Sequence, residues 1–390
     1  MCQVREASVM QNNLGVHALD HSSDSDRILF WDGFLPVQAM VLAALMINAP
    51  VAFGEESTLG HFPLCEASAA LIIDCPDRSG SCLLVGDNEQ RSDLFLFDLS
   101  NGTPDPGSQR RLHLSLDKGE KLSDIEALAP LADGSVLVMA SQSRNTKCEA
   151  KKNRRRWIEV RLSVTGATVR RQGQSGKIRC DRLFSDIKPG DGRVQAACAA
   201  IDQSEQRAIL VEDALKQGQL TEEQSKHRCN AITPFNIEGA LTIPGHNGTQ
   251  TWVGLRAPLV LEHPGQPEHQ QLAMLLRMKD LLAFTFDQVA LLDLGGRGIR
   301  DLTFARGQVW LIAGPAGDEE ASFELRRFPV DALQKNDIIV PERVQALPAF
   351  AEGLAIQDNL AYVVMDGDMG DNSSAKACKR PSRYLRLILK

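Results

Sequence analysis

An acidic residue at the head of an apolar strand recurs along the chain and limits its fold more than any other feature. The most complete copy spans residues 235–241 and leads into a second apolar stretch, residues 251–256, that ends in a polar group. Four further copies are headed by Glu66, Glu126, Asp301 and Glu352. A chain that repeats one strand–turn–strand unit builds its fold from stacked copies of that unit.

The spacing of the motif acids gives the size of the repeat. The acids at positions 66, 126, 238, 301 and 352 are separated by 60, 112, 63 and 51 residues. Because 112 is twice 56, we expect a degenerate copy within residues 168–232. Six units of about 57 residues, each rich in short strands, predict an all-β fold, a six-bladed β-propeller with four-stranded blades. Seven blades are the alternative.

The first unit contains four strand-like segments, the number in a propeller blade. Its third and fourth segments are the apolar run at 94–99 and the alternating run at 110–116, with the turn signal Asn101-Gly102 between them. The last apolar run of the chain, residues 384–389, has no unit of its own. We therefore expect strands from both ends of the chain to share one blade.

The degenerate unit lacks an acid-headed motif. Residues 194–201 and 207–211 are interpreted as its strands. Residues 212–228 carry helix formers, and they predict a helical excursion across one face of the propeller.

An apolar run near the N-terminus predicts export. Residues 40–53 are nearly all apolar, too few to span a bilayer and enough for the hydrophobic region of a signal peptide. We therefore divide the chain into an extension with a signal peptide, residues 1–54, and a single propeller domain, residues 60–390. The mature protein is expected in the periplasm or secreted from a bacterium, without a membrane span. A buried N-terminal helix is the alternative interpretation of the apolar run.

Eight cysteines follow residue 54, and an even number suits disulfides in an exported chain. Cys75 and Cys82 flank a short turn, where a bridge is geometrically easy. The other predicted pairs are Cys148 with Cys180 and Cys198 with Cys229. Free buried thiols are the alternative.

Charge and composition exclude some classes of function. The net charge of −7 gives no basic field for nucleic acid, and an aromatic content of 5% argues against base or sugar stacking. The chain carries none of the short motifs of serine hydrolases, zinc proteases or nucleotide-binding proteins. We expect a monomer.

Strand alternation predicts where the chemistry lies. In an antiparallel blade, the start of the innermost strand and the end of the second strand lie on one face. The polar residues at those positions therefore converge on one mouth of the central channel. The candidates are Glu66, Asp87, Asn88, Asp124, Glu126, Arg144, Glu238, Arg256, Arg300, Asp301, Glu352, Asp366 and Asp368.

Four of these acids occupy the same phase of their repeats: Glu126, Glu238, Asp301 and Glu352. A ring of carboxylates selects Ca²⁺ or another divalent cation, and the alternative is an arginine–carboxylate network. Arg144 and Arg256 can also present their guanidinium groups to an anionic ligand. Each acid can instead accept backbone N–H bonds and fasten one blade to the next.

The combined motifs resemble a bacterial family known as a domain of unknown function, DUF3616. The resemblance covers most of residues 65–389 and is carried by 124–128, 143–145, 236–239, 254–258, 300–302 and 352–355. It implies a propeller similar to phytase-like and lactonase-like propellers, which bind a divalent ion in the channel mouth. The expected function is a metal-assisted hydrolase of esters, lactones or phosphoesters. The alternative is a propeller without chemistry that binds a small anionic ligand or a protein.

Overall fold

The computed structural model describes residues 54–117, 119–185, 187, 190–245, 248–262, 269–317, 321–335, 337–367 and 378–390. The predicted signal peptide lies outside these residues. None of the described helices has the length and apolar character needed to cross a membrane.

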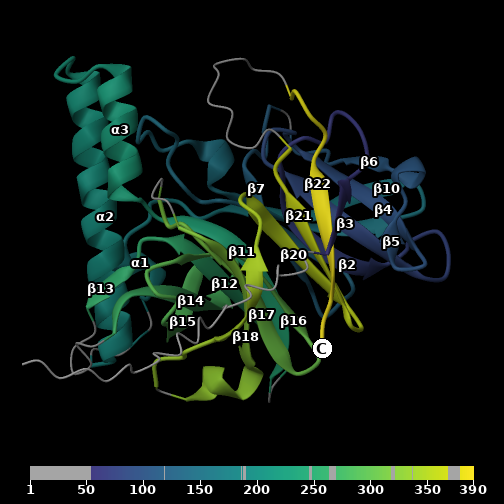
Figure 1. The fold of residues 1–390 in the computed structure, drawn as a ribbon. Coiled ribbons are helices and arrows are strands. Elements are labelled where there is room, and N and C mark those ends of the chain that lie inside the picture. The colour runs from purple at the N-terminus through teal and green to yellow at the C-terminus, as the bar shows by residue number, and fades with distance from the viewer. Residues whose placement is uncertain are drawn as a thin grey trace, which may run out of the picture. The chain divides into compact units, whose positions relative to one another are not determined.

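The described strands form five antiparallel sheets (Figure 1). From its innermost strand outward, the first contains β2 (Ala67–Asp74), β3 (Ser81–Asp87), β4 (Asp93–Ser100) and β6 (Arg110–His113), with β5 (Thr103–Pro104) on β4. The second contains β7 (Ile125–Pro130), β8 (Val136–Ala140), β9 (Arg156–Ser163) and β10 (Gly166–Gln174). The third contains β11 (Asn236–Gly245), β12 (Gly248–Ala257), β14 (Gln270–Asp280) and β15 (Thr285–Leu292), with β13 (Val260–Glu262) on β14.

The remaining two sheets follow the same order. The fourth contains β16 (Gly298–Ala305), β17 (Gln308–Gly314), β18 (Phe323–Pro329) and β19 (Glu342–Leu347). The fifth contains β20 (Ala351–Gln357), β21 (Leu360–Met365), β22 (Arg383–Ile388) and β1 (Glu55–Thr58). Three short 3₁₀ helices lie between strands, at Pro106–Ser108, Lys152–Arg154 and Val330–Gln334.

The innermost strands close into a ring. β2 contacts β7, β7 contacts β11, β11 contacts β16, β16 contacts β20, and β20 returns to β2. Among the described residues the fold is therefore a five-bladed β-propeller. The predicted six blades, and the alternative of seven, are wrong because β7 packs directly against β11 and leaves no position for another blade.

The fifth blade is completed by both ends of the described chain. β1 pairs antiparallel with β22, with Glu56 opposite Leu385. This confirms the expectation that strands from both ends share a blade. The propeller consequently begins at Glu55 rather than at residue 60.

Helices occupy the segment that was expected to be a blade. α1 (Cys180–Leu183), α2 (Gly192–Lys216) and α3 (Glu222–Ile232) lie between β10 and β11, and α2 packs beside α3 (Figure 1). The predicted strands at 194–201 and 207–211 lie within α2. Their buried apolar residues recur at the three- and four-residue spacing of a helix, at Val194, Ala197, Ile201, Ala208 and Val211.

Polar side chains cap the N-terminal ends of the two long helices, α2 and α3. Asp191 caps α2 by accepting the backbone N–H of Arg193 at 2.9 Å. Thr221 and Gln224 form a reciprocal capping box at the start of α3. The predicted helical excursion is thus confirmed, although its helices begin earlier and end later than residues 212–228.

The disulfides pair differently from most of the predictions. Cys75–Cys82 is confirmed. Cys148 pairs with Cys229, and Cys180 pairs with Cys198, so the predicted Cys148–Cys180 and Cys198–Cys229 pairs are wrong. A fourth disulfide joins Cys65 to Cys378. The correct pairs depend on the helical insertion, because Cys180, Cys198 and Cys229 each lie on a different helix.

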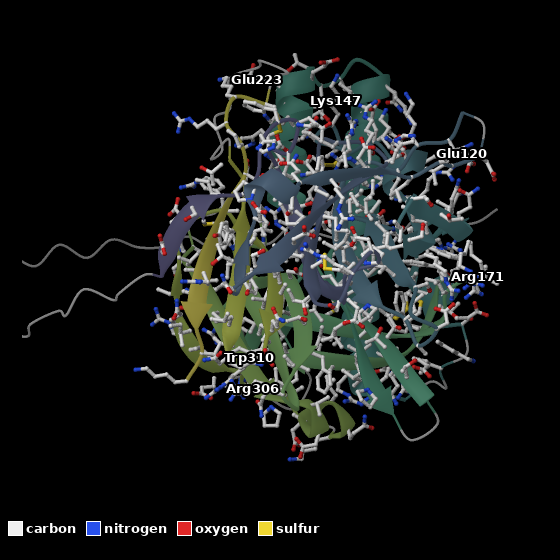
Figure 2. All side chains as sticks on the ribbon, turned by 90° about the vertical axis from the view of Figure 1, so that its right-hand side faces the viewer. Glu120, Lys147, Arg171, Glu223, Arg306 and Trp310 are labelled. Carbon is white, nitrogen blue, oxygen red and sulfur yellow. A yellow bond between two sulfur atoms is a disulfide. The ribbon has the colours of Figure 1, made fainter. Side chains whose placement is uncertain are left out.

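Cations of the second blade and of the loop before its third strand pair with acids from several segments. Arg156 forms a bidentate ion pair with Glu120, both distances being 2.6 Å, and Arg171 pairs with Glu159 on the adjacent strand. Lys147 pairs with Glu222 of α3. Glu120, Lys147 and Arg171 are labelled in Figure 2.

The lengths of the closed loops predict which disulfide stabilises the fold most. Cys65 and Cys378 are 313 residues apart, whereas Cys75 and Cys82 are 7 residues apart. By the loop-entropy relation, replacing the Cys65–Cys378 pair with alanines should lower the free energy of unfolding by about 5–6 kcal/mol, against about 2 kcal/mol for the Cys75–Cys82 pair. Denaturant titrations of the two double variants measure the difference, and equal losses would contradict it.

Candidate functional site

A β-bulge interrupts each innermost strand at the same point. In β7, for example, Ile125 faces Ala140 and Ala127 faces Met139, so that Glu126 has no partner across the ladder. A bulge of this kind re-aims the side chain of the extra residue. The residues at the five equivalent points are Ser68, Glu126, Glu238, Arg300 and Glu352. Because the innermost strands form a ring, these five residues form a ring as well, which we call the bulge ring.

In two blades the residue of the bulge ring differs from the predicted acid. Ser68, not Glu66, occupies the position in the first blade, and Arg300, not Asp301, occupies it in the fourth. The Ser68 hydroxyl donates a hydrogen bond to the carbonyl of Ile125 in the next blade. The predicted ring of four acids is therefore replaced by three acids and an arginine.

Asp301 fastens two blades together. Its carboxylate accepts the backbone N–H of Leu302 at 2.7 Å and that of Leu354, in the fifth blade, also at 2.7 Å. Burial raises the pKa of Asp301 well above its usual value, and the backbone donors oppose that effect. Asp301 therefore accepts backbone N–H bonds and joins one blade to the next, which is the alternative role expected for the motif acids.

Arg300 pairs with two carboxylates of the bulge ring. Its Nε lies 2.9 Å from Oε2 of Glu238 and 2.9 Å from Oε2 of Glu352, and its Nη2 donates to Oε1 of Glu352. Burial is the largest single effect and lowers the pKa of Arg300, but the charges of the surrounding glutamates and the hydrogen bond to Glu352 together outweigh burial and raise the pKa. The arginine–carboxylate network, one of the two predicted arrangements, is thus present among the described residues.

Two residues outside the ring also bind Glu238. Arg256 Nη1 donates to its Oε1 at 3.0 Å, and Asn236 Nδ2 donates to the same oxygen at 2.7 Å. Arg256 is itself held by the carbonyls of Pro315 and Gly317, at 3.2 and 3.1 Å. Glu238 therefore lies between two guanidinium groups.

Glu126 is the exception in the bulge ring. It is 7% exposed, and its carboxylate makes no hydrogen bond or ion pair with any described residue. Burial raises its pKa well above the usual value, and the charges of Asp124, Glu238 and Glu352 add to that effect. A carboxyl group in this position favours the protonated, neutral form.

Asp124 supplies a further acid beside Glu126. It accepts a hydrogen bond from the hydroxyl of Ser141 and pairs with Arg154 Nη1 at 2.8 Å, and burial raises its pKa. The group of buried and partly buried charges around Glu126 then contains four acids, Asp124, Glu126, Glu238 and Glu352, and three cations, Arg154, Arg256 and Arg300. With every group ionised, one negative charge is left over. A proton on Glu126 brings the group to neutrality.

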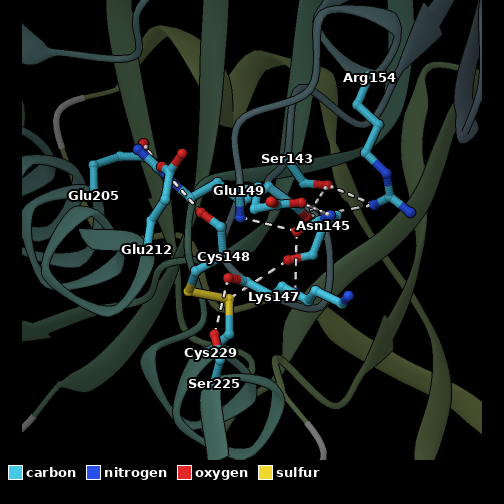
Figure 3. Close-up of a disulfide and its surroundings, with 11 residues drawn as sticks. Ser143, Asn145, Lys147, Cys148, Glu149, Arg154, Glu205, Glu212, Ser225 and Cys229 are labelled. Atoms are coloured by element: carbon cyan, nitrogen blue, oxygen red, sulfur yellow. Dashed lines mark hydrogen bonds and ion pairs between the residues drawn. A yellow bond between two sulfur atoms is a disulfide. The ribbon is translucent and has the colours of Figure 1, made fainter. Parts of the chain in front are cut away.

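Arg144 does not reach the bulge ring. Its Nε pairs with Glu205 at 3.0 Å and its Nη1 with Glu212 at 2.7 Å, both on α2. Figure 3 shows these two glutamates near the Cys148–Cys229 disulfide, which joins the loop after β8 to α3. Arg144 and the disulfide together fasten the helical insertion to the second blade.

Other predicted mouth residues have structural contacts. Asp87 accepts four backbone N–H groups, from Cys65, Glu66, Glu89 and Gln90, at distances from 2.8 to 3.0 Å. The backbone N–H of Asn88 donates to the carbonyl of Glu66 at 2.9 Å. Glu66 also forms an isolated β-bridge with Asp366. Asp368 lies outside the described residues.

A cavity of about 630 Å³ lies beside the bulge ring, and we call it the basic cavity. Three of its lining residues touch the buried acids: Arg154 pairs with Asp124, and Arg256 and Asn236 bind Glu238. Its other polar walls include Arg144, Asn145, Lys226 and Asn230. Lys226 and Asn230 lie on α3, and the sequence pattern did not single them out because it contains no signal that brings the helical excursion to the channel mouth.

The described donor set does not fit a divalent cation. Glu238 and Glu352 are already bound by Arg300, whose positive charge occupies the ring position that a fourth carboxylate was expected to fill. Within the described part of the chain, one group has metal-like spacing: Cys75, Cys82 and Asp98. Its two sulfur atoms form a disulfide and are therefore not thiolate ligands.

Comparisons with known proteins do not extend this description. No family model matches the chain, and no curated protein matches it. Similar solved structures include a putative glucose dehydrogenase from Thermus thermophilus, at 13% identity and a TM-score of 0.38, covering 86% of this chain and 100% of that one. Bacillus subtilis levansucrase is similar at 7% identity and a TM-score of 0.41, covering 86% of each chain.

The PQQ-bound aldose sugar dehydrogenase from Streptomyces coelicolor is similar at 15% identity and a TM-score of 0.35, covering 87% of this chain and 99% of that one. TM-scores this low carry no argument about fold or function. The five-bladed architecture therefore rests on the strand pairing and the ring of innermost strands. The resemblance to DUF3616 stays a prediction.

Glu126 and Asp301 should respond in opposite directions to removal of their charge. Folding at pH 8 requires Glu126 either to take up a proton or to bury an unpaired charge, and Glu126→Gln removes that cost, so it should raise the free energy of unfolding at pH 8 by roughly 1 kcal/mol or more. Asp301→Asn places an amide against backbone N–H donors and should lower it by roughly 2 kcal/mol. Denaturation of both variants tests the assignment, and a loss of stability in Glu126→Gln would contradict it.

The gain in Glu126→Gln should depend on pH. Because the pKa of Glu126 is raised in the folded state, folded protein holds a proton that unfolded protein has lost between the usual pKa of 4.5 and the raised one. The stability of the unmodified protein therefore falls as pH rises through that range. The advantage of the variant should grow as pH rises through that range, be complete above it and vanish below about pH 4.

Proposed function

We propose that this chain is an exported propeller that binds a small anionic ligand in the basic cavity. The observation that carries the proposal is the set of cations lining the cavity: Arg144, Arg154, Lys226 and Arg256. Two of them, Arg154 and Arg256, hold buried acids through one terminal nitrogen each. A carboxylate or phosphate is the ligand class that such a wall attracts.

Two of these cations have donors left for a ligand. Lys226 is exposed and makes no ion pair or hydrogen bond with the residues described. The interactions of Arg154 with described residues use Nη1 alone, so its Nη2 and Nε remain available. Asn236 adds a buried amide oxygen without a hydrogen-bond partner, which suits a donor on the ligand.

Export and the family relation belong to the same proposal. Four disulfides within the described residues support an oxidising compartment, the periplasm or the exterior. The DUF3616 relation and a monomeric state are proposed on the sequence alone.

Lys226→Gln should weaken binding of inorganic phosphate while leaving the fold intact, since the lysine has no structural partner among the described residues. Loss of one exposed cation should reduce affinity by roughly three- to tenfold at low salt, and the effect should shrink as ionic strength rises. Calorimetric titration measures both trends. Lys177→Gln is the matched control because Lys177 is exposed, carries the same charge and does not line the basic cavity. Equal affinities for the two variants would contradict the proposal.

Hydrolysis is the second candidate function, and Glu126 is the observation that favours it. A neutral carboxyl group beside ionised carboxylates is the arrangement in which one acid donates a proton while another acts as base or stabilises charge. In this hypothesis Glu126 protonates the leaving oxygen of an ester, lactone or phosphoester. The metal-assisted version is not supported, because Arg300 occupies the ring.

A screen of aryl esters, lactones and phosphoesters tests this second hypothesis. Turnover should fall as pH rises through the pKa of Glu126, because only the protonated form donates. Glu126→Gln should lower kcat by at least about 100-fold and leave phosphate affinity unchanged. Turnover that persists in this variant would remove Glu126 from the mechanism.

A further inference from the structure

A second cavity, of about 610 Å³, adjoins the basic cavity, and we call it the apolar cavity. Its volume lies within the range of ordinary ligand pockets. Its walls come from α2, the end of α3 and the segment around β13. Ten of its seventeen lining residues are apolar: Ala196, Ala199, Ala200, Ala231, Ile232, Pro258, Leu259, Val260, Leu261 and Ala316.

The two cavities share their dividing wall. Thr233 and Ala316 line both of them. Consecutive residues also line different cavities. Asn230 lines the basic cavity and Ala231 the apolar cavity, and Ala257 lines the basic cavity and Pro258 the apolar cavity. The two cavities are therefore immediate neighbours that meet at Thr233 and Ala316.

The two halves differ in chemistry. The basic cavity presents the cations already described. The apolar cavity presents the methyl groups of three α2 alanines on one side and Leu259 and Val260 on the other, and the polar residues of its α2 wall are Gln195, Gln203, Ser204 and Arg207. Leu261, also in its lining, is 59% exposed although it is a large apolar residue. A ligand that covers such a surface is stabilised in proportion to the apolar area that it removes from water.

The helices that form these walls are held in place. Cys148–Cys229 joins α3 to the loop after β8, and Cys180–Cys198 joins α1 to α2. Arg144 adds ion pairs to Glu205 and Glu212 of α2. A depression whose walls are fixed before binding loses little conformational entropy when a ligand enters.

We propose that the ligand is an amphiphilic anion, a carboxylate with an unbranched apolar tail, whose head lies in the basic cavity and whose tail lies in the apolar cavity. The proposal deepens the anion-binding function and rests on it. A short anion fills only the basic half, and a neutral apolar molecule leaves Lys226 and the remaining donors of Arg154 without a partner. An amphiphilic anion matches both halves at once.

A chain-length series tests the tail site. We expect octanoate to bind at least about 30-fold more tightly than acetate, since each buried methylene contributes about two- to fourfold in affinity. Ligand-observed NMR titration covers the weak end of the series. Octan-1-ol, with the same tail and no charge, should bind at least about tenfold more weakly than octanoate.

Bulky substitutions then locate the tail. Ala200→Phe and Ala196→Phe fill the apolar cavity from α2, and each should remove most of the gain of octanoate over acetate while leaving acetate affinity unchanged. Ile209→Phe is the matched control, because Ile209 lies on the same helix and lines neither cavity. Thermal melts show whether each variant folds, and the two cavity variants provide independent tests.

The outcomes separate the two proposals. Acetate and octanoate binding with equal affinity would overturn the tail site and leave the anion site standing. Absence of binding by both, and by phosphate, would overturn the anion-binding function itself. A gain for octanoate that survives in both folded cavity variants would also overturn the tail site.

Discussion

The centre of this propeller depends on one arginine. Arg300 takes the ring position that acids hold in three other blades, and it lies between Glu238 and Glu352. Buried carboxylates that lie close together repel one another. Removing the positive partner of a buried carboxylate lowers stability by several times more than an exposed ion pair contributes to it. One guanidinium therefore links the third, fourth and fifth blades through charge, in addition to the backbone contacts of their innermost strands.

The same arrangement leaves one acid without a partner among the described residues. Arg300 contacts two of the three bulge-ring carboxylates, and Arg154 serves Asp124, so that Glu126 keeps no cation of its own. Proteins retain such groups at a cost in stability, and perturbed titratable groups cluster at functional sites. The contrast between satisfied and unsatisfied acids within one ring identifies Glu126 as the residue to study first.

The sequence predicts the class of fold and three of the five ring positions. Glu126, Glu238 and Glu352 were placed correctly because each heads a similar strand. The prediction of Asp301 is wrong because the sequence pattern identifies ring positions by an acidic residue. In the structure the ring position is the bulged residue of each innermost strand, which in the fourth blade is Arg300. The blade count failed because a gap of 112 residues is also the length of one blade plus a helical insertion. The helical insertion carries Lys226 and three of the disulfide cysteines. Because it is not a repeat unit, the repeat pattern could not predict where these residues lie relative to the channel.

The shared fifth blade has a consequence for the order in which the fold is completed. β1 is the first strand of the propeller to be synthesised, and β22, its partner, is the last. Until β22 has emerged, β1 has no neighbour and the outer edge of β21 stays open, which is the kind of edge that pairs with other chains. Ring closure is consequently a late event that follows release of nearly the whole chain. Under the export proposed above, the final folding step takes place on the far side of the membrane, where oxidising conditions allow Cys65 and Cys378 to form their disulfide.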